Sequence, residues 1–599
     1  MHAADILILC LYAISIILGG LYFQRRSARD IDGFFLGGRK LPWWALGASG
    51  MAGNIDISGT MICTALVFAL GTGGFFVELR GGIVLVMAFL MVFMGKWNRR
   101  GQVMTLAEWM SLRFGRGRAG DAARFVSAVT SLILTLALIS FFALATGKFA
   151  AGFLNLDWRI AAVAMVTLAG FYTVASGLRA VVWIDVFQAG LILLICLIVV
   201  GLALHTVPGM AVDQIIQVPV PGVGGEGGMR ATTFGEWSAL IPAGGFDFTG
   251  NYATFNLFGV AVGFYFFKAM LEGFGGASSY MAQRYFASGS DREAGLTSLL
   301  WIGLLAFRWP MTGAIALLGI RHIAQGNTIP DPELVLPTVL HAYLPVGIKG
   351  LVLAGFFAAA LSTAAATVNA GAAYWVKDIY QGLMRPAAGE RAMIVQSRLA
   401  TVALLAVGTG LSFLVRNMNE IWDLTMMGIA SGLLVPQILR WYWPRYNGWG
   451  FAAGAAVGMA TAIGVKLAAP DITGYALFAA GNGAALAASV GVSLATRPTD
   501  PETLRHFYQL TRPFGLWKRF RDELSAERRA NVNRENLRDL TALCFAIPMQ
   551  ISLFLTGMML VFRRWDSAAI AGLCLACSCL GLWFFWFRHL SAAADETDS

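Results

Sequence analysis

The stretch GASGMAGNIDISGT, residues 47–60, decides how this chain folds. It crowds four glycines, an amide, a carboxylate and several hydroxyls into a segment that is otherwise apolar from Leu41 to Ala69. A charged side chain at the centre of a bilayer costs about 2.5 to 3.5 kcal/mol on insertion scales, so we expect Asp56 to face a cavity or a partner. Small residues in a span are also typical of tight helix packing. We favour an unwound segment, because its freed carbonyl oxygens can bind a cation.

The rest of the chain has the composition of a membrane protein. Hydrophobic residues make up 57% of its 599 residues and charged residues 13%, with a formal net charge of +10. Soluble proteins carry roughly 25% charged residues. The composition therefore excludes a soluble enzyme, a disordered chain and a disulfide scaffold. The basic excess sits in short loops between hydrophobic runs, which indicates membrane topology rather than binding to nucleic acid.

Hydrophobic runs recur along the chain, and the sequence predicts about fifteen membrane spans. The first run, residues 6–23, is followed by a basic cluster, so it is expected to be a retained span rather than a cleaved signal. Five spans follow it, then an acidic, glycine-rich stretch, then five more, and four close the chain. These fourteen spans are expected at 41–69, 82–94, 123–153, 160–176, 180–205, 255–274, 294–318, 347–376, 397–415, 420–443, 451–468, 473–496, 540–561 and 568–587.

Lys and Arg gather in alternate loops, which orients the chain. Basic loops stay in the cytoplasm, so the sequence predicts a multi-pass protein of the cell membrane, with the bacterial inner membrane as the expected location. The N-terminus is expected outside and the C-terminus in the cytoplasm. Arg563 and Arg564 are the exception, since the count of spans places them outside. Five spans per group put the second group into the membrane upside down, which is the inverted repeat of many transporters.

This topology divides the chain into seven expected parts. A first helix and a cytoplasmic loop precede the two five-helix repeats, which an external loop separates. Two accessory spans, a cytoplasmic linker and two C-terminal spans with a tail follow. The parts are expected at 1–40, 41–206, 207–252, 253–443, 444–496, 497–539 and 540–599, in which 41–206 and 253–443 are the repeats and 207–252 is the external loop.

A pair of hydroxyls is the second candidate feature. Ser362 and Thr363 are adjacent on an otherwise small and apolar helix segment, residues 356–369. Alone, such a pair often bonds back to its own helix. Beside an unwound segment, the hydroxyls can instead complete the oxygen ligands that a hard cation such as sodium prefers.

At this point the chain resembles the sodium/solute symporter family, whose members are sodium-coupled transporters of sugars, inositol, amino acids, vitamins and sialic acid. Six pieces carry the resemblance, in the family's order and within residues from about 5 to 495. They are FFLGGRKLPWWA at 34–45, GNI at 53–55, MTLAEW at 104–109, GLRAVVWIDVFQ at 177–188, QRY at 283–285 and AAALST at 358–363. Each piece alone is weak, but together they are specific.

The resemblance implies an all-α, leucine-transporter-type fold with a 5+5 inverted repeat, one extra N-terminal helix and four extra C-terminal helices. It also implies a sodium site of backbone carbonyls and hydroxyls. The implied ligands are the carbonyls of Ala52, Ile55 and Ala359 and the hydroxyls of Ser362 and Thr363.

The resemblance also bears on the number of sodium ions. Some relatives bind a second sodium with two further serines, where this chain has Ala365 and Ala366. We therefore expect one sodium per cycle and no other cofactor. Asp185, which matches an aspartate of that second site, is then expected to be a charge near the sodium site or a proton-linked group.

For the solute, sugar carriers of the family suggest positions on the broken helices. Glu78 matches one of their solute-binding residues, whereas Gly59 stands at the place of a glutamine, and Gly428 replaces another. Phe274 falls at the place of an aromatic inner gate. The candidate solute site is completed by Asn54, Asp56 and Glu272.

Three of these candidates are acidic, so we expect an acidic cavity. Carboxylates accept hydrogen bonds from sugar hydroxyls or from an ammonium group. An anionic solute is disfavoured unless Arg308 or Lys268 turns inward, because like charges repel strongly in a cavity of low dielectric constant. Glu78 has an alternative, an external salt bridge with Arg80. Lys268 and Arg308 could equally snorkel or pair structurally.

We therefore expect a sodium-coupled symporter that imports a small polar solute, with a sugar or polyol as the leading class. An amino acid or amine is the second candidate. A transporter-like membrane sensor is an alternative from another class. We expect no enzyme, since no nucleophile pairs with a base and no metal-spaced cluster is visible. The expected partners are the solute, sodium and the lipid bilayer, with neither nucleic acid nor an obligate protein partner.

Overall fold

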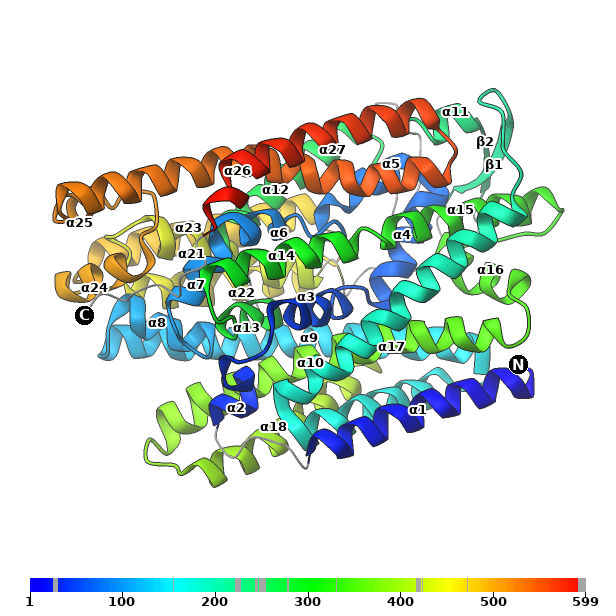
Figure 1. Cartoon of the computed structure of the whole chain (residues 1–599). Helices are drawn as coiled ribbons and strands as arrows, with labels where there is room; N and C mark the ends of the chain where they lie inside the picture. Colours follow the sequence, from blue (N-terminus) through cyan, green and yellow to red (C-terminus); the bar gives the residue numbers. More distant parts are fainter. Residues whose placement is uncertain are drawn as a thin grey trace.

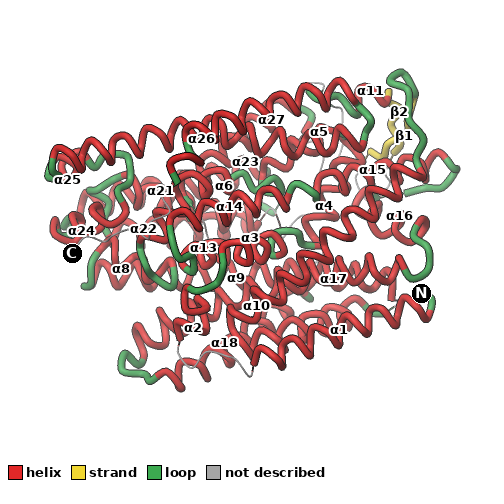
Figure 2. Tube along the Cα trace, viewed as in Figure 1, coloured by secondary structure: helices red, strands yellow, loops and turns green. Residues whose placement is uncertain are grey.

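The structure is a computed structural model that describes the chain except residues 25–30, 155, 221–227, 243–245, 247–254, 277–278, 330, 416–421, 423, 471 and 591–599. Helices run along nearly the whole described trace, and two short strands lie at one end of the molecule (Figure 2). The bundle has two ends: the hairpin end, which carries β1 and β2, and the charged end, which carries α24 and α25 (Figure 1).

The helices before the β-hairpin follow the order expected for one extra helix and a first repeat. Three elements precede the first repeat: α1 (Ala3–Gln24), α2 (Ile31–Leu36) and η1 (Gly37–Arg39). The first repeat contains α3 (Trp43–Ala52), α4 (Ile57–Leu70), α5 (Thr72–Val77), η2 (Glu78–Arg80), α6 (Val86–Phe89), η3 (Leu90–Met94), α7 (Gly95–Arg100), α8 (Leu106–Phe114), α9 (Arg118–Leu154) and α10 (Trp158–Thr206).

A short β-hairpin and the second repeat follow. The segment between the two repeats contains β1 (Ile215–Val220), β2 (Gly228–Thr233) and α11 (Phe234–Trp237). The second repeat contains α12 (Phe258–Gly275), α13 (Ser279–Phe286), α14 (Asp291–Leu305), α15 (Arg308–Ala324), η6 (Pro332–Leu334), α16 (Val335–Tyr343), α17 (Ile348–Ala373), η7 (Tyr374–Met384), α18 (Glu390–Ser412), η8 (Leu424–Ile429), α20 (Ala430–Gly432) and α21 (Leu434–Tyr442).

The remaining helices pack around the two repeats. They are α22 (Gly448–Ala468), α23 (Gly474–Ala495), α24 (Pro501–Thr511), α25 (Lys518–Asp522), α26 (Ala526–Val561), α27 (Trp565–Phe585) and η9 (Phe587–His589). Helices α22 and α23 form a close pair, and so do α26 and α27, of which α26 also packs on α15.

The count of fifteen spans is not confirmed. Among the described residues, 10 helices are long and apolar enough to cross a membrane, or 11 if the bent pair α3–α4 forms one span. The expected spans at 82–94, 160–176, 255–274 and 420–443 are not among them. The second of these is a shorter apolar helix, Trp158–Phe171, and the last begins outside the described residues. Of the other two, 82–94 is divided among short elements and α12 carries Lys268 and Glu272, and residues of both segments line the central cavity.

A glycine separates the two halves of α10, which the sequence predicts as two spans. Gly177 has φ 65° and ψ −164°, a conformation that side chains disfavour. A Cβ atom at this position would also lie 2.5 Å from the carbonyl oxygen of Phe34. Glycine therefore permits both the kink and the close approach of the segment before α3.

The two broken helices run in opposite directions, as an inverted repeat requires. Helix α4 ends beside the segment between the repeats, where the Trp237 indole donates to the Phe68 carbonyl (3.1 Å). Helix α12 begins beside the same segment, since the rings of Phe246 and Phe258 lie 5.4 Å apart. Helix α13 ends at the charged end, where Arg99 donates to the carbonyl of Gly289 (3.0 Å).

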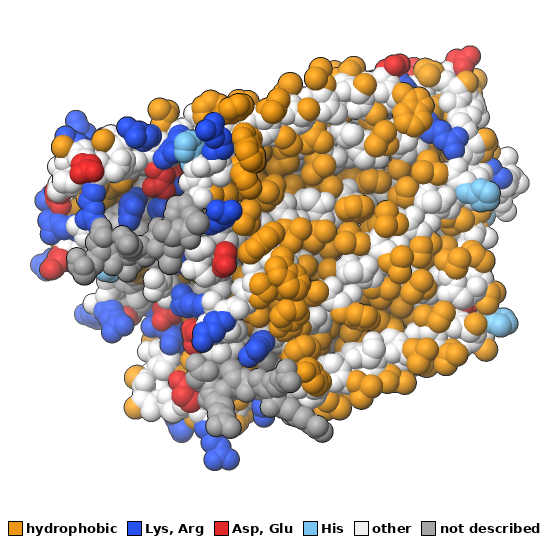
Figure 3. All heavy atoms as spheres, viewed as in Figure 1, with side chains coloured by type: hydrophobic (Ala, Val, Ile, Leu, Met, Phe, Trp, Pro, Cys, Tyr) orange, Lys and Arg blue, Asp and Glu red, His pale blue; other side chains and the backbone are white. Residues whose placement is uncertain are grey.

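Figure 3 shows a broad band of hydrophobic side chains over the middle of the molecule, whereas Lys, Arg, Asp and Glu gather at the charged end. The outer helices expose large apolar side chains, such as Leu7 on α1 and Leu573 on α27, which are 60% and 67% exposed. Such a band suits the hydrocarbon of a bilayer rather than water.

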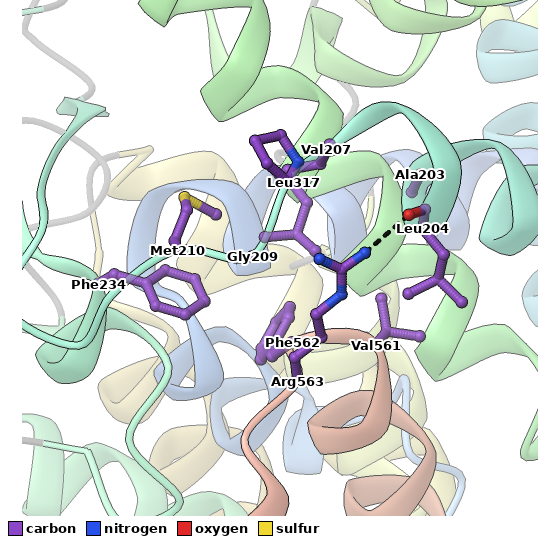
Figure 4. Close-up of a pocket in the computed structure, with 11 residues that line it drawn as sticks. Ala203, Leu204, Val207, Gly209, Met210, Phe234, Leu317, Val561, Phe562 and Arg563 are labelled. Atoms are coloured by element: carbon purple, nitrogen blue, oxygen red, sulfur yellow. Dashed lines mark hydrogen bonds between the residues drawn. The ribbon is translucent and has the colours of Figure 1, made fainter.

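Arg563 and Arg564, the exception to the charge rule, lie at the hairpin end and hold it together. Arg563 donates to the carbonyl of Leu204 at the end of α10 (2.7 Å), and Arg564 donates to Ser238 Oγ (2.9 Å). Arginine near a helix C-terminus satisfies carbonyls that have no partner in the helix. Figure 4 shows Arg563 between α10 and Phe562, in a crevice of about 10 Å³ that has room for about one water molecule.

The linker at 497–539 is partly helical, with α24, α25 and the start of α26, and it packs on the rest of the protein. Phe514 contacts the rings of Trp97 and Tyr442, with centroids 4.8 and 5.5 Å apart. Lys96 of α7 forms salt bridges with Glu535 and Asp539 of α26, both at 2.7 Å. The linker therefore closes the charged end of the bundle.

The packing of α3 on α14 gives a stability prediction. A Cβ atom at Gly50 would lie 2.2 Å from the buried ring of Trp301. We expect Gly50→Ala to lower the free energy of unfolding by about 1 to 3 kcal/mol, because the core must move to accept the methyl group. Thermal unfolding in detergent measures this as a lower Tm.

Gly190→Ala is the matched control. No described atom lies within 4 Å of a Cβ at Gly190, which is on the exposed side of α10. Because alanine favours a helix over glycine by about 1 kcal/mol, the control should have an equal or higher Tm. Equal Tm values for the wild type and Gly50→Ala would contradict the packing argument.

Candidate functional site

The candidate site forms around the break between α3 and α4. The two helices are bent by 63°, and the break spans Gly53 to Asp56. The Asp56 side chain caps α4 by accepting from the backbone N–H of Gly59 (3.1 Å). A helix end leaves carbonyl oxygens without intrahelical partners, so the break supplies polar groups in the middle of the bundle.

The hydroxyl pair of α17 meets this break. Ser362 Oγ donates to the carbonyls of Ala52 (2.7 Å) and Ala359 (3.0 Å), and Thr363 Oγ1 donates to the Ala359 carbonyl (2.9 Å). Ile55 is buried within the break. The first of these bonds joins α3 of one repeat to α17 of the other. A hydroxyl also accepts through its lone pairs, so these oxygens could turn towards a cation.

Tyr280 of α13 joins the break to the second broken helix. Its hydroxyl accepts from Asn54 Nδ2 (2.7 Å) and donates to the carbonyl of Gly53 (3.1 Å). The unwound residues are thus held by the partner repeat rather than by their own helix. The sequence analysis did not single out Tyr280, although it lies three residues before the QRY piece.

Asp185 lies in a buried network that also reaches α3. Ser49 Oγ donates to Asp185 Oδ2 (2.6 Å), and Arg284 donates to Ser49 Oγ (3.0 Å). The guanidinium of Arg284 lies 3.6 Å from the Asp185 carboxylate. Ser49 is one helical turn before Ala52, so Asp185 is connected to the break through α3 and is paired with a cation.

A cavity of about 250 Å³ opens beside the break and is lined by both repeats. Sites for drug-sized ligands measure roughly 300 to 1,000 Å³, so this cavity suits a smaller solute. The polar residues that line it are Asn54, Asp56, Glu78, Arg80, Glu272, Tyr280, Arg308, Thr363 and Gln437. Gly53 and Gly59 of the break also line it.

Two of the acidic candidates in this cavity are paired with cations. Glu78 Oε1 lies 3.1 Å from Arg80 Nε, so the alternative salt bridge forms, but it is buried in the cavity wall rather than external. Lys268 Nζ lies 2.6 Å from Glu272 Oε1 and donates to the carbonyl of Arg80 (3.0 Å). Lys268 is therefore buried inside the bundle, where it forms an ion pair with Glu272.

Arg308 also turns inward, at the start of α15. Its side chain lines the cavity near Asp56, and the residue is 2% exposed. A Cβ atom at Gly59 would lie 2.6 Å from both Arg308 Nη2 and Asp56 Oδ1. Glycine at position 59 therefore leaves the room that the guanidinium occupies.

The expectation of an acidic cavity is wrong. The three carboxylates of Asp56, Glu78 and Glu272 are matched by the three cations of Arg80, Lys268 and Arg308. Buried charges are costly without compensation, which explains why each acid in the wall has a basic residue nearby. The sequence shows the acidic residues, whereas the direction of the basic side chains depends on tertiary packing.

Phe274 does not line the cavity. It lies in an aromatic cluster towards the charged end, with its ring 5.1 Å from Phe89 and 6.1 Å from Tyr442. The Tyr442 hydroxyl donates to the Phe274 carbonyl (3.0 Å). Gly428 packs against Leu424 and Leu477, outside the cavity wall. Gln437 of α21 lines the cavity instead, which the sequence analysis missed.

Comparisons with known proteins agree with this architecture. Residues 34–460 match the Sodium:solute symporter family. The chain is 24% identical over 489 residues to the sodium/myo-inositol cotransporter 2 of Mus musculus, a match that covers 77% of this chain and 69% of that protein. It is 26% identical over 497 residues to the sodium/glucose cotransporter of Vibrio parahaemolyticus, covering 77% of this chain and 83% of that one.

A solved structure of a Na⁺-coupled sialic acid symporter in a substrate-bound outward-open state has the same fold. The TM-score is 0.66 at 18% sequence identity, and the match covers 83% of this chain and 99% of that one. The leucine-transporter-type fold predicted from the sequence is thereby confirmed. Since the family match extends over most of the chain and both repeats, this protein belongs to the sodium:solute symporter family.

Proposed function

We propose that this protein imports a small hydroxylated solute, of the sugar or polyol class, together with one sodium ion. The contact between the Ser362 hydroxyl and the carbonyl of Ala52 carries the proposal. It gathers oxygens from both repeats at the place where an α-helix is interrupted. Thr363 and Gly53 also line the cavity, so an ion held here would lie beside the solute.

In the proposed mechanism, sodium joins the two repeats. The ion would take the carbonyls of Ala52, Ile55 and Ala359 and the hydroxyls of Ser362 and Thr363. Because α3 and α17 belong to different repeats, an ion shared between them favours the conformation in which they touch. Solute binding in the adjacent cavity then permits the change from an outward-facing to an inward-facing state, in which 41–206 and 253–443 move relative to each other.

One sodium ion supplies enough free energy for accumulation. A tenfold inward gradient contributes about 1.4 kcal/mol and a potential of 100 mV about 2.3 kcal/mol. For a neutral solute, the sum corresponds to accumulation of roughly several hundredfold. An amine is the second candidate solute, because the Asp56 carboxylate lines the cavity.

We further propose that the charged end faces the cytoplasm, with the N-terminus on the other side. The basic loops that the sequence places inside lie together at this end, which supports the orientation. Asp185, which is paired with Arg284, is proposed to tune the sodium site through Ser49 rather than to bind an ion itself.

The double variant Ser362→Ala/Thr363→Ala tests the sodium site without knowledge of the solute. We expect the thermal stabilisation of the purified protein by sodium, measured against equal potassium, to be lost or to need at least about tenfold more sodium, because two ligands are removed. Thr401→Ala is the control, since its hydroxyl donates to Ser397 of its own helix. Sodium stabilisation at the wild-type level in the double variant would refute the proposed site.

The number of sodium ions gives a separate prediction. Ala365 and Ala366 are buried on α17 and offer no hydroxyl. Equilibrium binding of radioactive sodium to the purified protein should therefore saturate at about one ion per chain. The Asp185→Asn variant should bind the same number, and saturation at two ions in the wild type would contradict the assignment.

A further inference from the structure

Arg308 stands in the cavity wall with hydrogen-bond donors that the described chain does not satisfy. The residue is 2% exposed, and its Nε and Nη2 atoms have no hydrogen-bond partner among the described residues. A buried ionised group without hydrogen bonds is costly. Because this guanidinium lines a cavity rather than a packed core, its free donors indicate a ligand.

Asp56 balances the charge of Arg308 but does not occupy these donors. The Asp56 carboxylate accepts from the backbone of Gly59 at the start of α4. No carboxylate of the described residues lies within 4.0 Å of the Arg308 guanidinium. Gly59 leaves room for both groups at the cavity wall, because a Cβ atom there would lie 2.6 Å from Arg308 Nη2 and from Asp56 Oδ1.

Two acceptors in the same cavity also lack partners. Asn54 Oδ1 and Gln437 Oε1 are buried, and neither has a hydrogen-bond donor in the described part of the chain. An amide oxygen accepts hydrogen bonds and cannot donate. The cavity therefore presents a cationic group with free donors from α15, and neutral acceptors from the α3–α4 break and from α21.

We infer that the solute carries a carboxylate, which Arg308 binds, and hydroxyl groups, which donate to Asn54 and Gln437. The solute class is then a small hydroxy acid, such as a sugar acid, rather than a neutral sugar. Arginine matches a carboxylate with two parallel hydrogen bonds. The inference rests on the proposed function, because it takes this cavity as the solute site.

The charges of the cavity favour a single negative charge on the solute. The charges at the wall are balanced, because three carboxylates and two arginines line the cavity and the buried Lys268 pairs with Glu272. A sodium ion at Ser362 and Thr363 adds one positive charge beside it. One carboxylate restores the balance, whereas a phosphate would bring up to two negative charges. Sodium and a carboxylate would then favour each other's binding through their opposite charges.

Matched pairs of compounds test this inference. Binding to the purified wild-type protein is measured in sodium by thermal shift and calorimetry, with galacturonate against galactose, gluconate against sorbitol, and lactate against propane-1,2-diol. We expect at least one acid to bind about tenfold more tightly than its neutral partner, because a charge-assisted pair of hydrogen bonds is lost without the carboxylate. If no acid exceeds its neutral partner, the inference is overturned.

Variants then assign the preference to Arg308. Arg308→Gln should bind the acid and its neutral partner equally, whereas Arg308→Lys should keep part of the preference, since it keeps the charge but loses the forked geometry. Arg321→Gln, on the same helix, should bind as the wild type does, because Arg321 donates to the carbonyl of Thr206 at the hairpin end. An unchanged preference in both Arg308 variants overturns the assignment.

Sodium alone separates this result from the proposed function. The Arg308 variants should keep the wild-type stabilisation by sodium, which also shows that they are folded. If Arg308→Gln does not fold, the Arg308→Lys variant is the test. A preference for the acid as large as that of the wild type in this variant would contradict the forked contact. If sodium does not stabilise the wild-type protein, the proposed sodium coupling is refuted. The difference in affinity between the acid and its neutral partner still tests the role of Arg308.

Discussion

The structure depends on an interrupted helix in an environment that offers little water. Between Ala52 and Ile57 the backbone leaves the helix, and its polar groups need partners from elsewhere in the bundle. The Ser362 hydroxyl donates to the carbonyl of Ala52, and the Tyr280 hydroxyl donates to that of Gly53. Both partners come from the second repeat. The requirement to satisfy the break therefore also fixes how the two repeats meet.

The charged groups of the cavity follow the same physical rule. Glu78 with Arg80 and Lys268 with Glu272 form close pairs, so their charges are compensated locally. Asp56 and Arg308 differ, because the carboxylate caps α4 while the guanidinium keeps unused donors. We therefore propose that the cavity selects its solute through one group whose hydrogen-bond donors are unused among the described residues, rather than through an excess of acid.

The sequence predicts the break and the hydroxyl pair because each has a local signal. Glycines beside Asn54 and Asp56 disfavour a lipid-facing helix, and Ser362 with Thr363 stands out on a helix of small apolar residues. The directions of Arg308 and Lys268 have no such signal, since they depend on how α12 and α15 are rotated in the bundle. The predicted number of spans fails for a related reason. Helices such as α12 carry charges that lower their mean hydropathy, and pairing within the bundle compensates these charges.

The proposed sodium site lies beside the cavity and would link the two ligands electrostatically. A cation held by Ser362 and Thr363 would lie next to a wall in which Thr363 and Arg308 both take part. With a neutral solute, the loaded protein gains one charge, and the membrane potential drives that charge inward. With a carboxylate, the charges of sodium and solute cancel. The membrane potential then does no work on the movement of the loaded protein, and the sodium gradient alone supplies the free energy. In the proposed mechanism, the direction of one arginine side chain therefore determines both which solute binds and which part of the sodium motive force can accumulate it.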